Sequence, residues 1–212
     1  MAAHVASVLF SDFIQTLKYV NWMARFRVTA GIRDLDETKD QFSLLANTMP
    51  VFASFEGSWA GEHQHFSNKG QLLNAHRGIV QHQFPQTGTY AHIQRSQFYW
   101  EDGQEQMIEQ RSIFHDDQLI WEKGPFQGCI RETSYGNVLV NITQRTAPQL
   151  CLNEFVNVES NGNARLRTRI WLKDGRLFKR TLCYEHRMDN HCSEALCPLA
   201  PDCPPSAFDR QM

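Results

Sequence analysis

Turn signals recur along the chain from residue 52 to residue 187, and this rhythm restricts the possible folds more than any other feature. Their regular spacing, at intervals of roughly 10 to 15 residues, is typical of an antiparallel meander. Glycine after Asn or Asp supplies the positive φ angle that a tight hairpin needs. The signals are Asn68-Lys69-Gly70, Pro85-Gln86-Thr87-Gly88, Glu101-Asp102-Gly103, His115-Asp116-Asp117, Tyr135-Gly136-Asn137, Ala147-Pro148, Asn161-Gly162-Asn163 and Lys173-Asp174-Gly175.

The segments between the turns alternate in polarity, as strands with two different faces do. Consecutive strands in an open sheet would leave two unpaired edges, and closure into a barrel removes both. Such a barrel holds side chains or one small ligand. We therefore predict a mainly β fold, an up-and-down antiparallel barrel of about eight to ten strands, with a β-sandwich as the alternative.

Three segments divide the chain. Residues 1–50 are expected to form helices that pack on the barrel, because apolar residues in 9–24 follow helical spacing and 37–46 fits a second helix. Met49-Pro50 should end that second helix, since the residue before a proline avoids the α region. Residues 51–188 form the barrel, and 189–212 form a tail rich in Cys and Pro. The helix at 9–24 also suggests a homodimer.

Composition excludes several classes of function. The chain has 212 residues, with 21 Lys and Arg against 23 Asp and Glu, so its net charge of −2 argues against a nucleic-acid partner. No apolar run is long enough for a membrane span. The N-terminus lacks the basic start of a signal peptide, so we expect a cytoplasmic protein. The 14 Phe and 5 Trp suggest a large apolar interior or a lined pocket.

Two motifs resemble known families. Gly57-Ser58-Trp59 follows a predicted helix and precedes the first strand, and it resembles the Gly-x-Trp motif of lipocalin-like proteins, in which the Trp plugs the closed end of the barrel. Arg165-Leu166-Arg167-Thr168 with Gly175, Cys183, Glu185 and Arg187 resembles the last two strands of the lipocalin-fold bilin lyases. These enzymes attach linear tetrapyrroles to phycobiliproteins.

Residues 59–73 and 123–128 resemble a group of cyanobacterial lipocalin-like proteins with no assigned activity. Together the resemblances cover residues 52–187 and imply a lipocalin-like, or calycin, barrel. The bilin lyases also imply that Arg165, Arg167 and Glu185 are pocket residues, and Glu154 falls near another Glu of that family. The N-terminal segment and the tail depart from the lyase pattern.

The arginine cluster has two interpretations. Alternation favours solvent-facing side chains for Arg165, Arg167 and Arg169, with Leu166 and its neighbours filling the core. The resemblance implies the opposite. If the arginines lie inside, Arg165 and Arg167 would bind an anionic group through forked donors. Glu154 or Glu185 could then act as acid or base if burial raised its pKa.

The histidines are scattered. His63 and His65 would share a strand face, where we expect solvated side chains, and a two-histidine metal half-site is the alternative. His92 lies on the same face as Phe98 and Trp100 and is the preferred single base. We predict no resident metal, although Cys192, Cys197 and Cys203 of the tail lie near His186 and His191 and offer a zinc alternative.

Motifs for nucleophilic catalysis and nucleotide binding are absent, so no cofactor is expected. Neither Cys151 nor Cys183 has a sequence-adjacent His to activate it, and we expect Cys129, Cys151 and Cys183 to be small buried residues. Chemistry would then depend on the shape of the pocket, its aromatic lining and one or two acid or base groups.

The predicted function is binding of an apolar conjugated small molecule in the barrel cup, with a cofactor-free isomerisation, cyclisation or addition. Arg165 or Arg167 would bind its anionic group, and His92, Glu154 or Glu185 would move a proton. The remaining substrate-binding residues would be Phe98, Trp100 and Trp121. The alternatives are a bilin chromophore lyase or chaperone, and a non-catalytic carrier.

Overall fold

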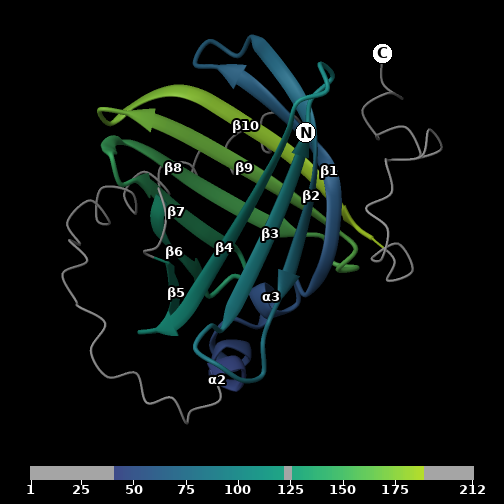
Figure 1. Cartoon of the computed structure of the whole chain (residues 1–212), viewed down its shortest axis with the longest axis vertical. Coiled ribbons are helices and arrows are strands. Elements are labelled where there is room, and N and C mark those ends of the chain that lie inside the picture. Colours follow the sequence, from purple (N-terminus) through teal and green to yellow (C-terminus); the bar gives the residue numbers. More distant parts are fainter. Residues whose placement is uncertain (1–40, 122–125, 189–212) are drawn as a thin grey trace, which may run out of the picture. The chain divides into compact units, whose positions relative to one another are not determined.

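Ten antiparallel strands form a closed barrel in the computed structural model, which describes residues 41–121 and 126–188 (Figure 1). Each strand pairs with its sequence neighbours, and β10 pairs with β1 to close the barrel. This confirms the up-and-down barrel and excludes the sandwich. The strands are β1 (Gly57–Ser67), β2 (Leu72–Gln83), β3 (His92–Tyr99), β4 (Glu105–His115), β5 (Gln118–Trp121), β6 (Phe126–Glu132), β7 (Val138–Gln144), β8 (Ala147–Val158), β9 (Ala164–Lys173) and β10 (Arg176–Arg187).

Every predicted turn signal except Ala147-Pro148 coincides with a junction between strands. Asp116, Asp117 and Asp174 adopt φ angles of 49°, 57° and 51°, the left-handed values that short hairpin turns require. The exception is displaced by two residues, because Ala147 already begins β8 and the turn lies before it.

Two short helices, α2 (Gln41–Thr48) and α3 (Pro50–Ala53), lie at one end of the barrel (Figure 1). Met49 between them has φ −130° and ψ 60°, outside the α region, because it precedes Pro50. The described part of the helix predicted at 37–46 is therefore helical and ends where expected. The helix predicted at 9–24, the dimer that would use it and the Cys-rich tail all lie outside the described residues.

The core at this end of the barrel is built around Trp59, which is fully buried. Its Nε1 donates to the carbonyl of Phe55 at 2.8 Å, the Phe55 ring packs beside it, and the Phe52 ring packs on that of Phe55. The guanidinium groups of Arg165 and Arg187 lie over the Trp59 ring at 4.3 and 4.4 Å. Trp59 thus closes this end of the barrel. Within the described residues, no helix is long and apolar enough to cross a membrane.

Candidate functional site

A cavity of about 470 Å³ occupies the barrel interior, which places it within the usual range for a small-molecule pocket. One side is aliphatic, with side chains from β4 and β6 to β8. The opposite side is aromatic and charged, with side chains from β1 to β3 and from β8 to β10. The aliphatic lining includes Ile108, Ile130, Val138, Val140, Ile142 and Leu152, and the aromatic and charged lining includes His65, His76, Phe98, Trp100, Glu154, Arg165, Arg167, Arg169, Trp171 and Lys179.

The three arginines of β9 point into the barrel, so the solvent-facing interpretation was wrong. Arg165 and Arg167 are 1% and 6% exposed, and Leu166 between them is 42% exposed. Alternation along a strand separates two faces but does not say which one is inside. Buried charge is tolerated here because carboxylates from β8 and β10 meet the arginines inside the barrel.

An ion-pair network joins these side chains. Arg165 Nε donates to Glu185 Oε2 at 2.5 Å, and Arg167 Nη1 donates to Glu185 Oε1 at 2.9 Å. Glu154 Oε1 accepts from Arg167 Nε at 2.5 Å and from Arg169 Nε at 2.9 Å. Because each carboxylate serves two guanidinium groups, the network is both rigid and fully ionised.

The pKa values of the carboxyl groups follow from this network. Burial alone would raise the pKa of Glu154, but Arg167 and Arg169 hold it at about 2. Burial would likewise raise the pKa of Glu185, yet Arg165 and Arg167 hold it well below its usual value. Burial also lowers the pKa of Arg165 to about 10. The condition for either glutamate to act as a general acid, a raised pKa, is therefore not met in this arrangement.

Five histidines lie inside the barrel, so the expectation that His63 and His65 are solvated was wrong. The members are His63, His65, His76, His82 and His92, none more than 8% exposed. Burial, reinforced by the nearby arginines, lowers the pKa of each one. The pKa is about 4 for His65 and His76 and about 3 for His92. All five are neutral at pH 7.

Two of these histidines extend the arginine network toward the helices. Arg165 Nη1 lies 3.1 Å from His82 Nε2, and His82 Nδ1 lies 3.0 Å from His92 Nε2. A guanidinium can only donate, so His82 accepts through Nε2 and donates from its Nδ1–H to His92 Nε2. His92 consequently carries its proton on Nδ1, which is buried without a partner among the described residues.

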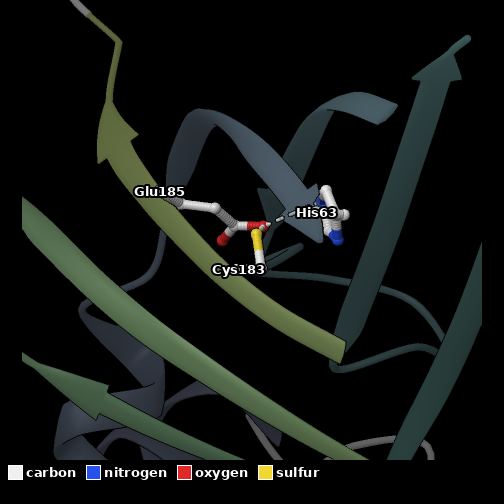
Figure 2. A group of neighbouring side chains, drawn as sticks. All are labelled: His63, Cys183 and Glu185. Atoms are coloured by element: carbon white, nitrogen blue, oxygen red, sulfur yellow. Dashed lines mark hydrogen bonds and ion pairs between the residues drawn. The ribbon is translucent and has the colours of Figure 1, made fainter. Parts of the chain in front are cut away.

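Figure 2 shows a second polar group, in which His63 of β1 and Cys183 and Glu185 of β10 point toward one another. His63 Nε2 lies 3.7 Å from Glu185 Oε1, and the Cys183 thiol lies 3.6 Å from the same oxygen. The possible ligand atoms lie within 4.8 Å of one another, which is close enough to consider a metal ion.

The surrounding hydrogen bonds disfavour a cation at this group. Arg169 Nη1 lies 3.3 Å from His63 Nδ1 and can only donate, so the proton of neutral His63 sits on Nε2 and faces Glu185. Arg167 already occupies Glu185 Oε1. Burial and the adjacent Glu185 raise the pKa of Cys183 well above its usual value, so the thiol keeps its proton. The proton on His63 Nε2, which has no hydrogen-bond partner among the described residues, and the proton of the thiol both disfavour a metal ion here.

Five of the eight predicted site residues line the cavity, and the other three do not. Phe98, Trp100, Glu154, Arg165 and Arg167 line the cavity, whereas His92, Glu185 and Trp121 are buried behind its surface. Trp121 packs in the hydrophobic core, where its ring lies against Gly128. Their roles in binding or catalysis remain predictions.

Sequence reasoning did not assign a binding or catalytic role to His65, His76, Arg169 or Lys179, which line the charged side of the cavity. A signal for two of them existed in the alternation, because His65 follows His63 and Arg169 follows Arg167 on one strand face. His76 and Lys179 had no such signal, since only the pairing of β2 with β1 and of β10 with β9 places them beside these residues.

Comparisons with known proteins establish the fold. No family model and no curated protein matches the sequence. A protein of unknown function from the DUF3598 family of Nostoc punctiforme superposes with a TM-score of 0.53 at 16% identity, over 64% of this chain. The match covers 48% of that protein, so this chain spans about half of its length.

The S-type phycobiliprotein lyase CPES from Guillardia theta superposes with a TM-score of 0.52 at 11% identity, over 70% of this chain and 97% of the lyase. The lipocalin-like barrel expected from the sequence resemblances is therefore confirmed. At these identities the likeness concerns the fold alone.

Proposed function

We propose that the barrel binds an apolar, conjugated small molecule in its cup. The observation that supports this most directly is the cavity itself, about 470 Å³ in volume and lined by aliphatic side chains opposite aromatic ones. The Trp100 and Phe98 rings lie 6.3 Å apart, and the His76 ring lies 4.7 Å from that of Trp100. A wall of rings facing aliphatic side chains suits a flat ligand with few polar groups.

A neutral fluorescent probe tests this proposal. Phenylnaphthylamine should gain fluorescence with the purified protein, because its rings would leave water for the cavity. Ile142→Trp, which fills the aliphatic side of the cavity, should weaken binding by about tenfold or more. Leu166→Trp places the same side chain on the outer face and should leave binding unchanged. Equal binding by both variants, or no binding by the folded wild-type protein, would contradict the proposal.

A bilin lyase or chaperone is a second candidate, supported by the superposition on almost the whole length of the CPES lyase. It requires that the cup accept a linear tetrapyrrole. Biliverdin should then show a shifted absorption band in the presence of this protein, and Ile142→Trp should abolish the shift. An unchanged spectrum at excess protein would exclude this candidate while leaving binding of smaller molecules intact.

Turnover without a cofactor, as an isomerisation, cyclisation or addition, is supported by Glu154. It is the acidic side chain that lines the cavity within the described residues. Because this carboxylate is ionised, it would act as the base that takes a proton from a conjugated substrate. Protein purified from its own source should retain the native ligand in native mass spectrometry. The wild-type protein should convert that ligand, whereas Glu154→Gln should bind it without converting it. Conversion by both proteins would exclude a catalytic role for Glu154.

A further inference from the structure

A patch of cationic and hydrogen-bond-donating side chains lies on the cavity wall toward the β9–β10 turn, away from the end closed by Trp59. Arg169 of β9 pairs with Thr181 of β10, which pairs with His65 of β1. Lys179 follows on the same face of β10, with its ammonium group 4.1 Å from the centre of the Trp171 ring. Three neighbouring strands therefore direct these groups toward one region of the cavity.

The charges in this region do not balance. Four cations line the cavity, namely Arg165, Arg167, Arg169 and Lys179. The two nearby carboxylates, Glu154 and Glu185, are taken by the three guanidinium groups. Within the described residues no carboxylate pairs with Lys179. Burial and the charge of Arg169 accordingly lower the pKa of Lys179. The cavity wall thus keeps an excess of positive charge that a bound anion would neutralise.

A chain of hydrogen bonds runs through the patch. Thr181 Oγ1 accepts from Trp171 Nε1 at 2.9 Å and lies 2.7 Å from His65 Nδ1, and His65 Nε2 lies 3.1 Å from His76 Nδ1. A hydroxyl can both donate and accept, so the chain can run in either direction. A bound anion would select the direction in which Thr181 donates to His65 and His65 Nε2 donates to His76 Nδ1.

In that direction the proton of neutral His76 sits on Nε2. This atom has no hydrogen-bond partner among the described residues, and His76 lines the cavity. The ring is held in place between His63, stacked at 4.8 Å, and Trp100, at 4.7 Å. The patch therefore offers an anion an ammonium group, a guanidinium group and an imidazole that can donate from Nε2.

We propose that the ligand is a conjugated organic acid whose carboxylate binds to Lys179, Arg169 and His76 while its rings lie along the aromatic wall. This inference rests on the proposed function and specifies its substrate class. Lys179 has no carboxylate partner among the described residues, and Arg169 shares Glu154 with Arg167, so a bound anion would neutralise the excess positive charge that a neutral ligand would leave in place. Burial, and after it the charges of Lys179 and Arg169, lower the pKa of His65 and of His76 to about 4, and the second contribution agrees with a positive potential at this place.

A matched pair of probes separates this inference from the proposed function. Anilinonaphthalene sulfonate and phenylnaphthylamine have the same ring system with and without an anionic group. Lys179→Met should weaken binding of the sulfonate by about five- to tenfold and change binding of the neutral probe by less than about twofold. His76→Phe keeps the aromatic stack and removes the donor, so it should act in the same direction. Lys173→Met, at an exposed lysine at the end of β9, is the matched control and should change neither.

Retinoic acid and retinol, used as competitors of the neutral probe, extend the test to a carboxylate. Retinoic acid should lose affinity in Lys179→Met, and retinol should not. Equal losses for the charged and neutral members of both pairs, or no loss at all, would overturn the anion site and leave the proposed binding function in place. Failure of every probe to bind the folded protein would contradict both.

Discussion

The guanidinium of Arg165 is held against the carboxylate of Glu185, with Nε and Oε2 2.5 Å apart and both side chains almost wholly buried. The same guanidinium stacks on Trp59, which closes one end of the barrel. One arginine therefore joins the closed end of the barrel to the charged wall of the cavity.

Glu185→Gln should strongly destabilise the protein. The substitution keeps the size of the side chain but removes the negative charge that faces Arg165 and Arg167 in the interior. Loss of one partner of a buried pair lowers the free energy of unfolding by about 3–5 kcal/mol, which urea denaturation would measure. Glu109→Gln removes a carboxylate that pairs with Arg95 and Arg111 at the surface and should change little. Similar effects of the two substitutions would contradict a buried network.

Stability should fall as the pH is lowered from 7 toward 4. The five interior histidines have folded-state pKa values below the ordinary 6.5, so the unfolded chain binds more protons than the native state below that pH. The fully buried His92, with a pKa of about 3, contributes up to about 1.4 kcal/mol per pH unit in this window. Below pH 4.5 the unfolded chain also takes up a proton at Glu154, whose folded pKa is about 2, and this lowers the free energy of unfolding further.

Urea unfolding at pH 7.5, 6 and 5 measures this dependence. His92→Phe should make the slope shallower, because one buried neutral base is removed. His115→Gln is the control for the removal of a histidine from the surface, since that side chain is 44% exposed. A stability that does not change over this range would show that the histidines are solvated.

Cobalt should not bind through Cys183. Because the His63 proton faces Glu185 and the thiol stays protonated, Co(II) would have to displace two arginine contacts to reach the group. Wild type and Cys183→Ala should therefore give the same near-ultraviolet spectrum on titration with Co(II). A thiolate-to-cobalt charge-transfer band that disappears in Cys183→Ala would establish a metal site here.

Gly61→Ala should destabilise the barrel where β1 meets β10. A Cβ at this position would collide with the carbonyl oxygen of Tyr184 and approach Glu185 Cα at 2.9 Å. Overpacking against backbone costs about 1–3 kcal/mol and would shift the thermal midpoint downward. Gly70→Ala, at an open turn with φ +84°, introduces only backbone strain and should lower the midpoint less. The reverse order would mean that β1 and β10 do not approach closely here.

Local signals in the sequence were sufficient for the strand order and the barrel class. Turn residues such as Asp116 and Asp174 act over a few positions, and their φ angles agree with the hairpins predicted from them. Pro50 likewise defined the end of α2, because its ring restricts the backbone of Met49 directly. Each of these effects depends on neighbours in the chain, so it can be predicted without knowing the fold.

The identity of the inner face was decided only by the tertiary structure. The period of two in β9 separates Arg165 from Leu166 but is the same whichever residue points inward. Arg165 lies inside because strand pairing brings Glu185 to it from β10, and β8 brings Glu154 opposite Arg169, within reach of Arg167. The histidine cluster depends on strand register too, as His63 and His76 are directly paired across β1 and β2. Long-range register, which sums many weak contacts across the barrel, therefore determines the charge and the hydrogen-bond donors of the cavity.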